Sequence, residues 1–186
     1  MANFIDNSHF SHHDDYYTKK ESWFQLQKIK HKIAPTKILE ACCMGANLSK
    51  SAEYLAELFE CPVVENKQNF LDLDNDTIRE NYSHIITNPP FKNPGKQNII
   101  TKLLEIDLPF IIILNSTNIY AKWFRQTFGD KIKDTQILNP LQKLCFHKAF
   151  KNANDEWELQ KKTHAPPFYP VFVSYKLRLD SADLFL

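Results

Sequence analysis

The chain has 186 residues, of which 43% are hydrophobic and 13% aromatic, and this is enough to bury the core of one compact domain. A formal net charge of +1 excludes a global basic field, so any affinity for nucleic acid must come from a local patch. No apolar run is long enough to span a bilayer, and the first residues lack a basic segment followed by an apolar stretch, so we expect an intracellular protein with no membrane partner.

The first third of the chain predicts a polar arm followed by a helix and a strand-turn-helix unit. Residues 1–15 are polar and are expected to form a flexible arm ahead of a single domain over 16–186. The segment 21–30 has apolar side chains at helical spacing with lysines between them. The segment 37–43 is an apolar run too short for a helix, and 47–59 then has the pattern of a turn and a helix. These last two segments form half of a βαβ unit.

The middle of the chain continues this alternation. Residues 62–64 predict a second short strand, and 69–73 is either a third strand or an extended loop. An apolar strand over 82–86 leads into the sequence Asn-Pro-Pro, and a helix is predicted over 97–106. Residues 109–114 are almost wholly apolar, which is typical of a strand buried on both faces of a parallel sheet.

The end of the chain predicts one more helix, over 119–128, and two late strands, over 144–146 and 171–177. Because no clear helix separates the late strands, we expect them to pair antiparallel at the end of an otherwise parallel sheet. Strands that alternate with helices indicate a doubly wound, Rossmann-like α/β fold. We also expect the strands 38–42 and 85–87 to be neighbours at the centre of the sheet.

The cysteines and histidines do not predict a metal site. The four cysteines include the adjacent Cys42 and Cys43 and form no C-x-x-C, so we interpret them as reduced, mostly buried thiols. His9, His12 and His13 lie in the polar arm without a partner cluster. We therefore assign no metal.

The clearest chemical signal is the sequence Thr87-Asn88-Pro89-Pro90-Phe91, which directly follows an apolar strand. Ligands of an open α/β sheet bind at the carboxyl ends of its strands. The two prolines fix φ, remove two amide donors and hold the preceding residue extended, so the loop presents oxygen acceptors. The Asn88 side-chain oxygen and the Pro89 carbonyl can accept both N–H bonds of a planar amine, which favours a pyramidal nitrogen and frees its lone pair. Phe91 is then positioned to stack on the ring.

This segment resembles the Asn-Pro-Pro-Phe motif of adenine-N6 DNA methyltransferases, which have the class I S-adenosylmethionine-dependent methyltransferase fold. The resemblance implies S-adenosylmethionine as cofactor and a mostly parallel sheet with an antiparallel C-terminal strand pair. It also implies that Asn88, Pro89, Pro90 and Phe91 are the catalytic residues. Methyltransferases that act on protein glutamine or on guanine amines of ribosomal RNA have similar motifs.

Three weaker segments extend the resemblance over most of the chain from Asp15 to Leu177. Tyr16-Tyr17-Thr18-Lys19 is similar to the family's aromatic-x-Thr-Pro segment beside the methionine end of the cofactor. The run from Ile38 to Leu48 is similar to the family's cofactor loop. Asn69-Phe70-Leu71 is similar to the segment whose acidic residue and ring contact the cofactor's adenine.

The end of the second strand supplies one further candidate, because Glu65 lies near the offset from the loop at which an acidic residue binds ribose hydroxyls. The cofactor-binding residues implied by these segments are Tyr17, Thr18, Glu40, Ala41, Cys42, Gly45, Ala46, Asn47, Leu48, Glu65, Asn69 and Phe70.

The chain departs from the family's pattern in each of these segments. Lys19 stands in place of a proline, Met44 and Ala46 in place of glycines, and Asn69 in place of the acidic residue. Only Gly45 remains in the turn, where glycines allow positive φ and close approach to a ligand. The short spacing between the second strand and Asn69 has no room for the usual helix, so we expect the sheet to be reduced at one edge.

The sequence thus favours methyl transfer to the N6 amine of adenine in DNA, with the base taken from a single strand or flipped out of a duplex. The alternative enzyme is an RNA or protein-glutamine N-methyltransferase. The lost glycines leave open a catalytically inactive methyltransferase-like subunit that binds nucleic acid or protein. Because no separate target-recognition domain is visible, a homodimer or a specificity partner also remains open.

Overall fold

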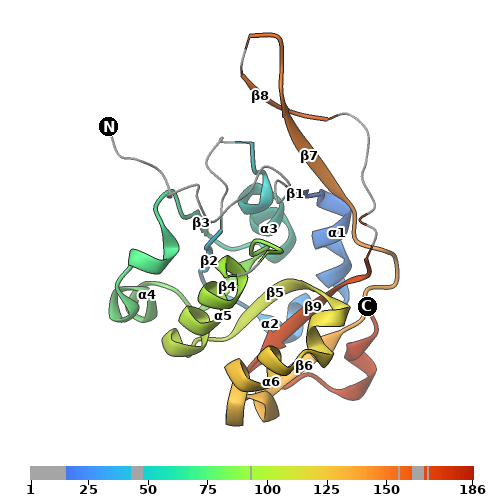
Figure 1. Ribbon diagram of the computed structural model, residues 1–186. Coiled ribbons are helices and arrows are strands. Elements are labelled where there is room, and N and C mark those ends of the chain that lie inside the picture. The colour runs from blue at the N-terminus through green and yellow to red at the C-terminus, as the bar shows by residue number, and fades with distance from the viewer. Residues whose placement is uncertain (1–15, 43–47, 93, 155, 161–165, 167) are drawn as a thin grey trace.

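The computed structural model describes residues 16–42, 48–92, 94–154, 156–160, 166 and 168–186. Helices cover both faces of a central sheet, so the chain forms three layers (Figure 1). The arm over 1–15 and the loop residues Gly45, Ala46 and Asn47 lie outside the described residues.

The central sheet has six strands in the order β3-β2-β4-β5-β9-β6. Their bounds are β3 (Val63–Glu65), β2 (Ile38–Glu40), β4 (His84–Thr87), β5 (Phe110–Asn115), β9 (Pro170–Tyr175) and β6 (Thr135–Leu138). The strands β3, β2, β4 and β5 are parallel, whereas β9 runs antiparallel to both β5 and β6. This topology confirms the expected Rossmann-like α/β fold and the expected contact between the strands β2 and β4.

Two groups of helices cover the two faces of this sheet (Figure 1). Side chains from α1, η2 and α3 pack on one face, and side chains from α4, α5 and α6 pack on the other. The helices and 3-10 helices are α1 (Lys20–Phe24), η2 (Gln25–Ile29), α2 (Lys30–Ile33), α3 (Ser51–Phe59), η3 (Phe70–Asp72), α4 (Asn75–Asn81), α5 (Gly95–Ile106), η4 (Ser116–Tyr120), α6 (Lys122–Phe128), η5 (Gly129–Asp134) and η6 (Ser181–Leu184).

Strand β5 explains why the sheet is buried on both sides. Its side chains alternate between the faces, with Phe110, Ile112 and Leu114 in the core under α5 and α6, and Ile111 and Ile113 in the core under α1 and α3. All five side chains are fully buried. A continuous apolar run is what such a strand requires.

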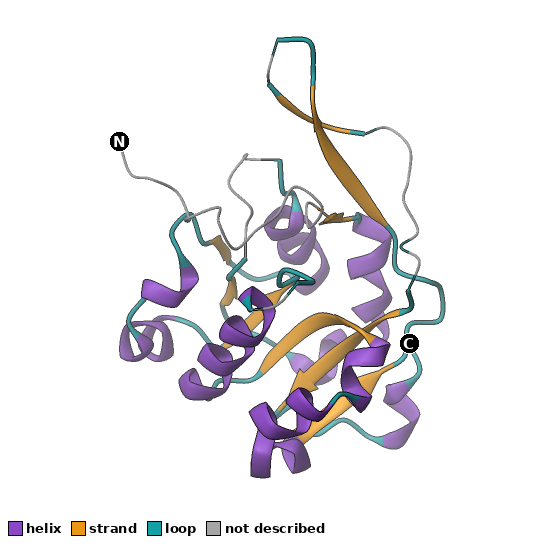
Figure 2. Cartoon of the chain, in the orientation of Figure 1, coloured by secondary structure: helices purple, strands orange, loops and turns teal. Residues whose placement is uncertain are grey.

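A second, three-stranded sheet in the order β1-β7-β8 lies beside the central one. It consists of β1 (Tyr16–Thr18), β7 (Phe146–Lys151) and β8 (Trp157–Leu159), and both pairs are antiparallel. The β7–β8 hairpin projects away from the body of the molecule (Figure 2). The base of this hairpin therefore holds the first described residues of the chain against the fold.

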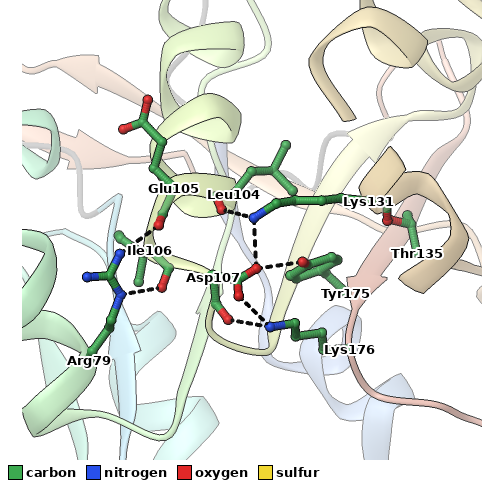
Figure 3. Close-up of polar contacts among 9 residues, drawn as sticks. All are labelled: Arg79, Leu104, Glu105, Ile106, Asp107, Lys131, Thr135, Tyr175 and Lys176. Atoms are coloured by element: carbon green, nitrogen blue, oxygen red, sulfur yellow. Dashed lines mark hydrogen bonds and ion pairs between the residues drawn. The ribbon is translucent and has the colours of Figure 1, made fainter. Parts of the chain in front are cut away.

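The C-terminal end of α5 is fixed by a polar cluster (Figure 3). Asp107 adopts a left-handed conformation with φ 63° and ends the helix. Its carboxylate accepts hydrogen bonds from Lys131 Nζ at 2.8 Å, from Tyr175 Oη at 2.7 Å and from Lys176 Nζ at 2.6 Å. Burial opposes ionisation, but these three hydrogen bonds lower the pKa of Asp107 well below its usual range. Arg79 caps the same helix end by donating to the carbonyl oxygens of residues 105 and 106.

Several local expectations are corrected by the structure. The predicted pairing of 144–146 with 171–177 is wrong, because β9 pairs with β5 and β6, and β7 belongs to the second sheet. The segment 69–73 forms η3 and not a strand, since the Asn69 side chain accepts from the backbone N–H of Leu71 and turns the chain. The short α4 then leads directly to β4, so the central sheet ends at β3 and is reduced at that edge, as expected.

Candidate active site

A pocket lies where β2 and β4 end, next to β1. It is lined by Tyr16, Tyr17, Thr18, Glu40, Cys42, Ser49, Ser51, Asn88, Pro89 and Pro90. The parallel strands β2 and β4 are adjacent, so the residues that follow them meet at the same edge of the sheet. The pocket thereby joins three segments that the sequence analysis had selected separately.

Asn88 is held in a defined orientation. Its amide Nδ2 donates to the backbone oxygen of Tyr16 at 3.1 Å. Because a carbonyl oxygen only accepts, the NH₂ group must face Tyr16, and this leaves the amide oxygen on the other side of the group. Asn88 Oδ1 is buried and has no hydrogen-bond partner among the described residues. A buried acceptor without a partner is costly, so such a group in a native structure requires an explanation, and a catalytic role or a bound ligand is one.

The two prolines line the pocket, whereas Phe91 packs beside it. The Phe91 ring lies in an aromatic cluster, with ring centroids 5.7 Å from Tyr16, 5.8 Å from Phe146 and 5.0 Å from Phe168. Phe91 remains half-buried. The ring expected to stack on a base is therefore also the contact between the Asn-Pro-Pro loop and the second sheet.

Lys96 anchors the far end of the same loop. This lysine, 5% exposed, donates from Nζ to the Phe91 carbonyl oxygen at 3.0 Å and to Asn118 Oδ1 at 3.1 Å. The ammonium group also lies 5.1 Å from the centre of the Trp123 ring. Charged hydrogen bonds and the cation–π contact give this buried cation its partners.

Thr87 links the two central strands through its hydroxyl. The hydroxyl donates to Glu40 Oε1 at 2.7 Å and accepts from the backbone N–H of Cys42 at 2.9 Å. Thr87 is fully buried and Glu40 is 2% exposed. The Glu40 carboxylate is thus fixed in position at the end of β2 by Thr87, the residue directly before Asn88.

Cys42 is not a nucleophile in this setting. Burial, and then the charge of Glu40, raises the pKa of the Cys42 thiol above its usual range. The thiol therefore stays protonated at neutral pH. Cys42, Cys61 and Cys145 are all free thiols and only half-buried, so the expectation of mostly buried thiols is too strong for these three.

The ends of β2 and β3 are joined through Asn66. Its Nδ2 donates to the Ala41 carbonyl oxygen at 3.0 Å and to the Gln68 carbonyl oxygen at 2.9 Å, and its backbone N–H donates to the Glu40 carbonyl oxygen at 2.9 Å. Glu65 is the register partner of Glu40 on the neighbouring strand. The two carboxylate residues therefore end adjacent strands side by side, although Glu65 is not among the pocket-lining residues.

The remaining expected cofactor residues have mixed surroundings. Thr18 Oγ1 is buried, lines the pocket and has no hydrogen-bond partner among the described residues. Tyr17 is buried beside it, whereas Leu48 is half-buried outside the pocket lining. Phe70, 3% exposed, packs in the core under α5, and Asn69 caps η3 and donates to Asp72 at 3.0 Å.

Six residues in or around this site are not among the candidates that the sequence predicts: Tyr16, Ser49, Ser51, Asn66, Thr87 and Lys96. Thr87 was read only as the first letter of the loop motif, and its hydroxyl matters because it reaches Glu40, 47 positions earlier. A lysine just ahead of the helix predicted over 97–106 looks like a solvated residue. Its burial depends on Trp123 and Asn118, which only the folded chain brings near.

The solved structures that are similar to this chain are only distantly similar. No protein-family model and no curated protein matches the chain. A SAM-dependent O-methyltransferase from Thermotoga maritima is 12% identical with a TM-score of 0.37, and the match covers 87% of this chain and 67% of that one. A DNMT2 variant from Spodoptera frugiperda is 15% identical with a TM-score of 0.38, covering 77% of this chain and 43% of that one.

A chain from a type I R-M system is 7% identical with a TM-score of 0.39, covering 83% of this chain and 42% of that one. The chain thus spans less than half the length of two of these three proteins. At such identities and TM-scores the matches carry no argument about activity, and the fold assignment rests on strand order and register.

None of the helices in the described part of the chain is both long and apolar enough to cross a membrane.

Proposed function

We propose that this protein transfers a methyl group from S-adenosylmethionine to the exocyclic N6 amine of adenine in DNA. The observation that carries this proposal is Asn88, whose NH₂ group is fixed on the Tyr16 carbonyl and whose buried oxygen has no partner among the described residues. Such an oxygen is an acceptor already stripped of water. It suits a ligand that brings its own N–H donor.

The chemistry of the target amine explains why this acceptor is useful. The lone pair of an exocyclic ring amine is delocalised into the ring, so the nitrogen is a weak nucleophile. Acceptance of one N–H bond by Asn88 Oδ1 and of the other by the Pro89 carbonyl favours the pyramidal nitrogen, whose lone pair is available. Because both acceptors are held by the rigid loop, they need no reorganisation when the amine reacts.

The residues beside Asn88 fit S-adenosylmethionine by their donor and acceptor chemistry. The cofactor carries an ammonium group and a ribose diol, and both are hydrogen-bond donors. Glu40 and Glu65 end adjacent strands in register and offer carboxylate acceptors, and the buried Thr18 hydroxyl, which has no partner among the described residues, can accept as well. When bound, the cofactor supplies an electrophilic methyl group and leaves as a neutral thioether.

Within this proposal the chain's own residues bind, orient and exclude water. Glu40, which the Thr87 hydroxyl fixes, would hold the donor-rich end of the cofactor, and Glu65, its register partner on β3, would accept from the ribose diol. The target base, whether from a single strand or flipped from a duplex, is bounded by Pro90 and by the aromatic cluster around Phe91.

A competition experiment with labelled S-adenosylmethionine tests this function. The protein is incubated with adenine-containing DNA, with RNA of the same sequence and with a glutamine-containing peptide, and the label is located after separation. We expect label in DNA, at N6 of adenine. Label in RNA or in the peptide instead would contradict the DNA assignment and identify the protein as an RNA or protein-glutamine N-methyltransferase.

Cofactor binding is measured separately by calorimetry or thermal shift. If the folded protein shows no interaction at millimolar S-adenosylmethionine, the result would favour an inactive methyltransferase-like subunit. Met44 and Ala46, which stand in place of the family's glycines, would agree with that outcome.

A further inference from the structure

Two tyrosines stand out on the surface near the Asn-Pro-Pro loop. Tyr120 is 79% exposed at the end of η4, and Tyr169 is 71% exposed just before β9. Strand β9 begins opposite the end of β5, since Pro170 pairs with Asn115. The backbone N–H of Ser116 donates to the Tyr169 carbonyl oxygen at 2.9 Å, so the segments that carry the two tyrosines are joined at the carboxyl edge of the sheet.

Both tyrosines are linked to Phe91 within one or two residues. Phe168, which precedes Tyr169, has its ring centroid 5.0 Å from that of Phe91. Asn118, which lies two residues before Tyr120, shares the Lys96 ammonium group with the Phe91 carbonyl oxygen. The chain segments that carry the two exposed rings are therefore both connected to the Phe91 segment.

The charge of this edge favours a polyanion. Lys143 Nζ lies 4.7 Å from the centre of the Tyr169 ring, and Lys122 comes two residues after Tyr120. The sequence segments 88–104, 108–129 and 135–154 contain lysines and arginines but no aspartate or glutamate. The segments that carry the two tyrosines and Lys143 are therefore locally basic in sequence, although the net charge of the chain is only +1.

We propose that Tyr120 and Tyr169 form a stacking platform for unpaired bases next to the target, with Lys143 beside the phosphates. The proposal rests on the proposed function, and it names single-stranded or locally unpaired nucleic acid as the form in which the substrate is bound. Exposed rings with adjacent cations are how proteins hold unpaired strands without reading their sequence, because every base offers a π-face. The tyrosine platform thus supplies affinity for the strand on either side of the target base.

Fluorescence anisotropy with a labelled, adenine-containing single-stranded oligonucleotide tests the platform on the full chain without cofactor. We expect Tyr120→Ala and Tyr169→Ala each to weaken binding about tenfold, and Tyr120→Phe and Tyr169→Phe to bind like the wild type. Because both side chains are exposed, thermal unfolding should not change.

The charged partner is tested with a matched control. Lys37 lies 5.0 Å from the Tyr82 ring at the opposite edge of the sheet and makes the same kind of pair as Lys143 and Tyr169. Lys143→Gln should reduce the slope of log affinity against log salt by about one, whereas Lys37→Gln should leave it unchanged.

The outcomes separate the platform from the reaction. Wild-type affinity in both alanine variants, or preferential binding of a glutamine-containing peptide over the oligonucleotide, overturns the platform, and does so even if DNA is methylated. Ring-dependent binding of the oligonucleotide by a protein that transfers no methyl group supports the platform and refutes only the proposed function.

Discussion

The amino edge and the carboxyl edge of the central sheet differ in how completely selected buried polar groups are hydrogen-bonded. At the amino edge, where β5 begins and β9 ends, the Asp107 carboxylate has three donors on it (Figure 3). At the carboxyl edge, Asn88 Oδ1 and Thr18 Oγ1 are buried without a partner among the described residues. Polar satisfaction stabilises the first edge, whereas the second carries unmet hydrogen-bonding capacity that a ligand can use.

The largest effect is expected at the carboxyl edge, from Asn88→Ala. If the amide oxygen acts on the reacting nitrogen, its loss should lower the rate of methyl transfer on the order of 10²–10³-fold while cofactor affinity stays unchanged. Both quantities are measured on the same protein. The matched control is Asn75→Ala, because Asn75 Oδ1 is also buried without a partner among the described residues but lies on α4, away from the pocket. Equal rates in the two variants would make the Asn88 orientation a purely structural feature.

The next effect is expected from Thr87→Val, which keeps the side-chain shape and removes the hydroxyl. Glu40 Oε1 and the Cys42 N–H then lose a buried partner, at a cost of about 2–3 kcal/mol in the free energy of unfolding. Cofactor affinity should fall as well, since the Glu40 carboxylate is no longer fixed.

Denaturant unfolding and calorimetry measure the two consequences of Thr87→Val. Thr87→Ser should restore both, and Ser174→Ala, which removes a buried hydroxyl from β9, should alter stability alone. A Thr87→Val protein with wild-type cofactor affinity would show that the hydroxyl does not position Glu40.

At the amino edge, Asp107→Asn should cost about 1–2 kcal/mol of stability and leave methyl transfer unaffected. Asparagine tolerates the left-handed backbone, so the change isolates the carboxylate charge. The pKa of Asp107 is lower in the folded protein than its ordinary 3.8, so this contribution is present above pH 4 and is lost as the pH falls further. The variant should therefore lose less stability than the wild type between pH 4 and pH 2.

The smallest effect is expected from His84 at the same edge. Burial lowers the pKa of His84 from 6.5 to about 4, so the unfolded chain binds more protons than the folded protein between these values. The free energy of unfolding should fall as the pH is lowered from 6.5 to 4, on the order of 1 kcal/mol because the imidazole is only half-buried. His84→Gln should flatten this part of the stability profile, measured by urea unfolding at each pH, and an unchanged profile would assign the slope to other groups.

The amino-acid pattern predicted the elements whose information is local. The strands β2, β4 and β5 are apolar runs, and α5 has helical apolar spacing that ends at Asp107. Strand β6 was missed because Thr135–Leu138 is short, largely half-buried and preceded by charged residues. The pairing of 144–146 was wrong because antiparallel partners depend on which strand lies nearby, and Phe146 pairs with Thr18 through contacts across the whole chain.

The candidate site likewise has some features that follow from local sequence and others that depend on contacts between distant segments. The Asn-Pro-Pro sequence predicted a loop at the carboxyl end of β4, where Asn88, Pro89 and Pro90 line the pocket, because two prolines restrict the backbone wherever they occur. The orientation of the Asn88 amide could not be predicted, since it depends on a carbonyl oxygen 72 positions earlier. The role of Phe91 within an aromatic cluster likewise depends on Phe146 and Phe168, which come from distant segments.

Strand β1 connects two parts of the molecule mechanically. It has three residues, pairs with β7 along its whole length, and offers the Tyr16 carbonyl oxygen to Asn88. Strand β1 thus connects the projecting β7–β8 hairpin on one side to the Asn88 amide on the other. Because β1 pairs with β7 and with no strand of the central sheet, a displacement of the hairpin that shifts β1 acts directly on the hydrogen bond between Tyr16 and Asn88. The rigidity of the β1–β7 pairing at the base of the hairpin therefore determines how tightly the orientation of the Asn88 amide is held.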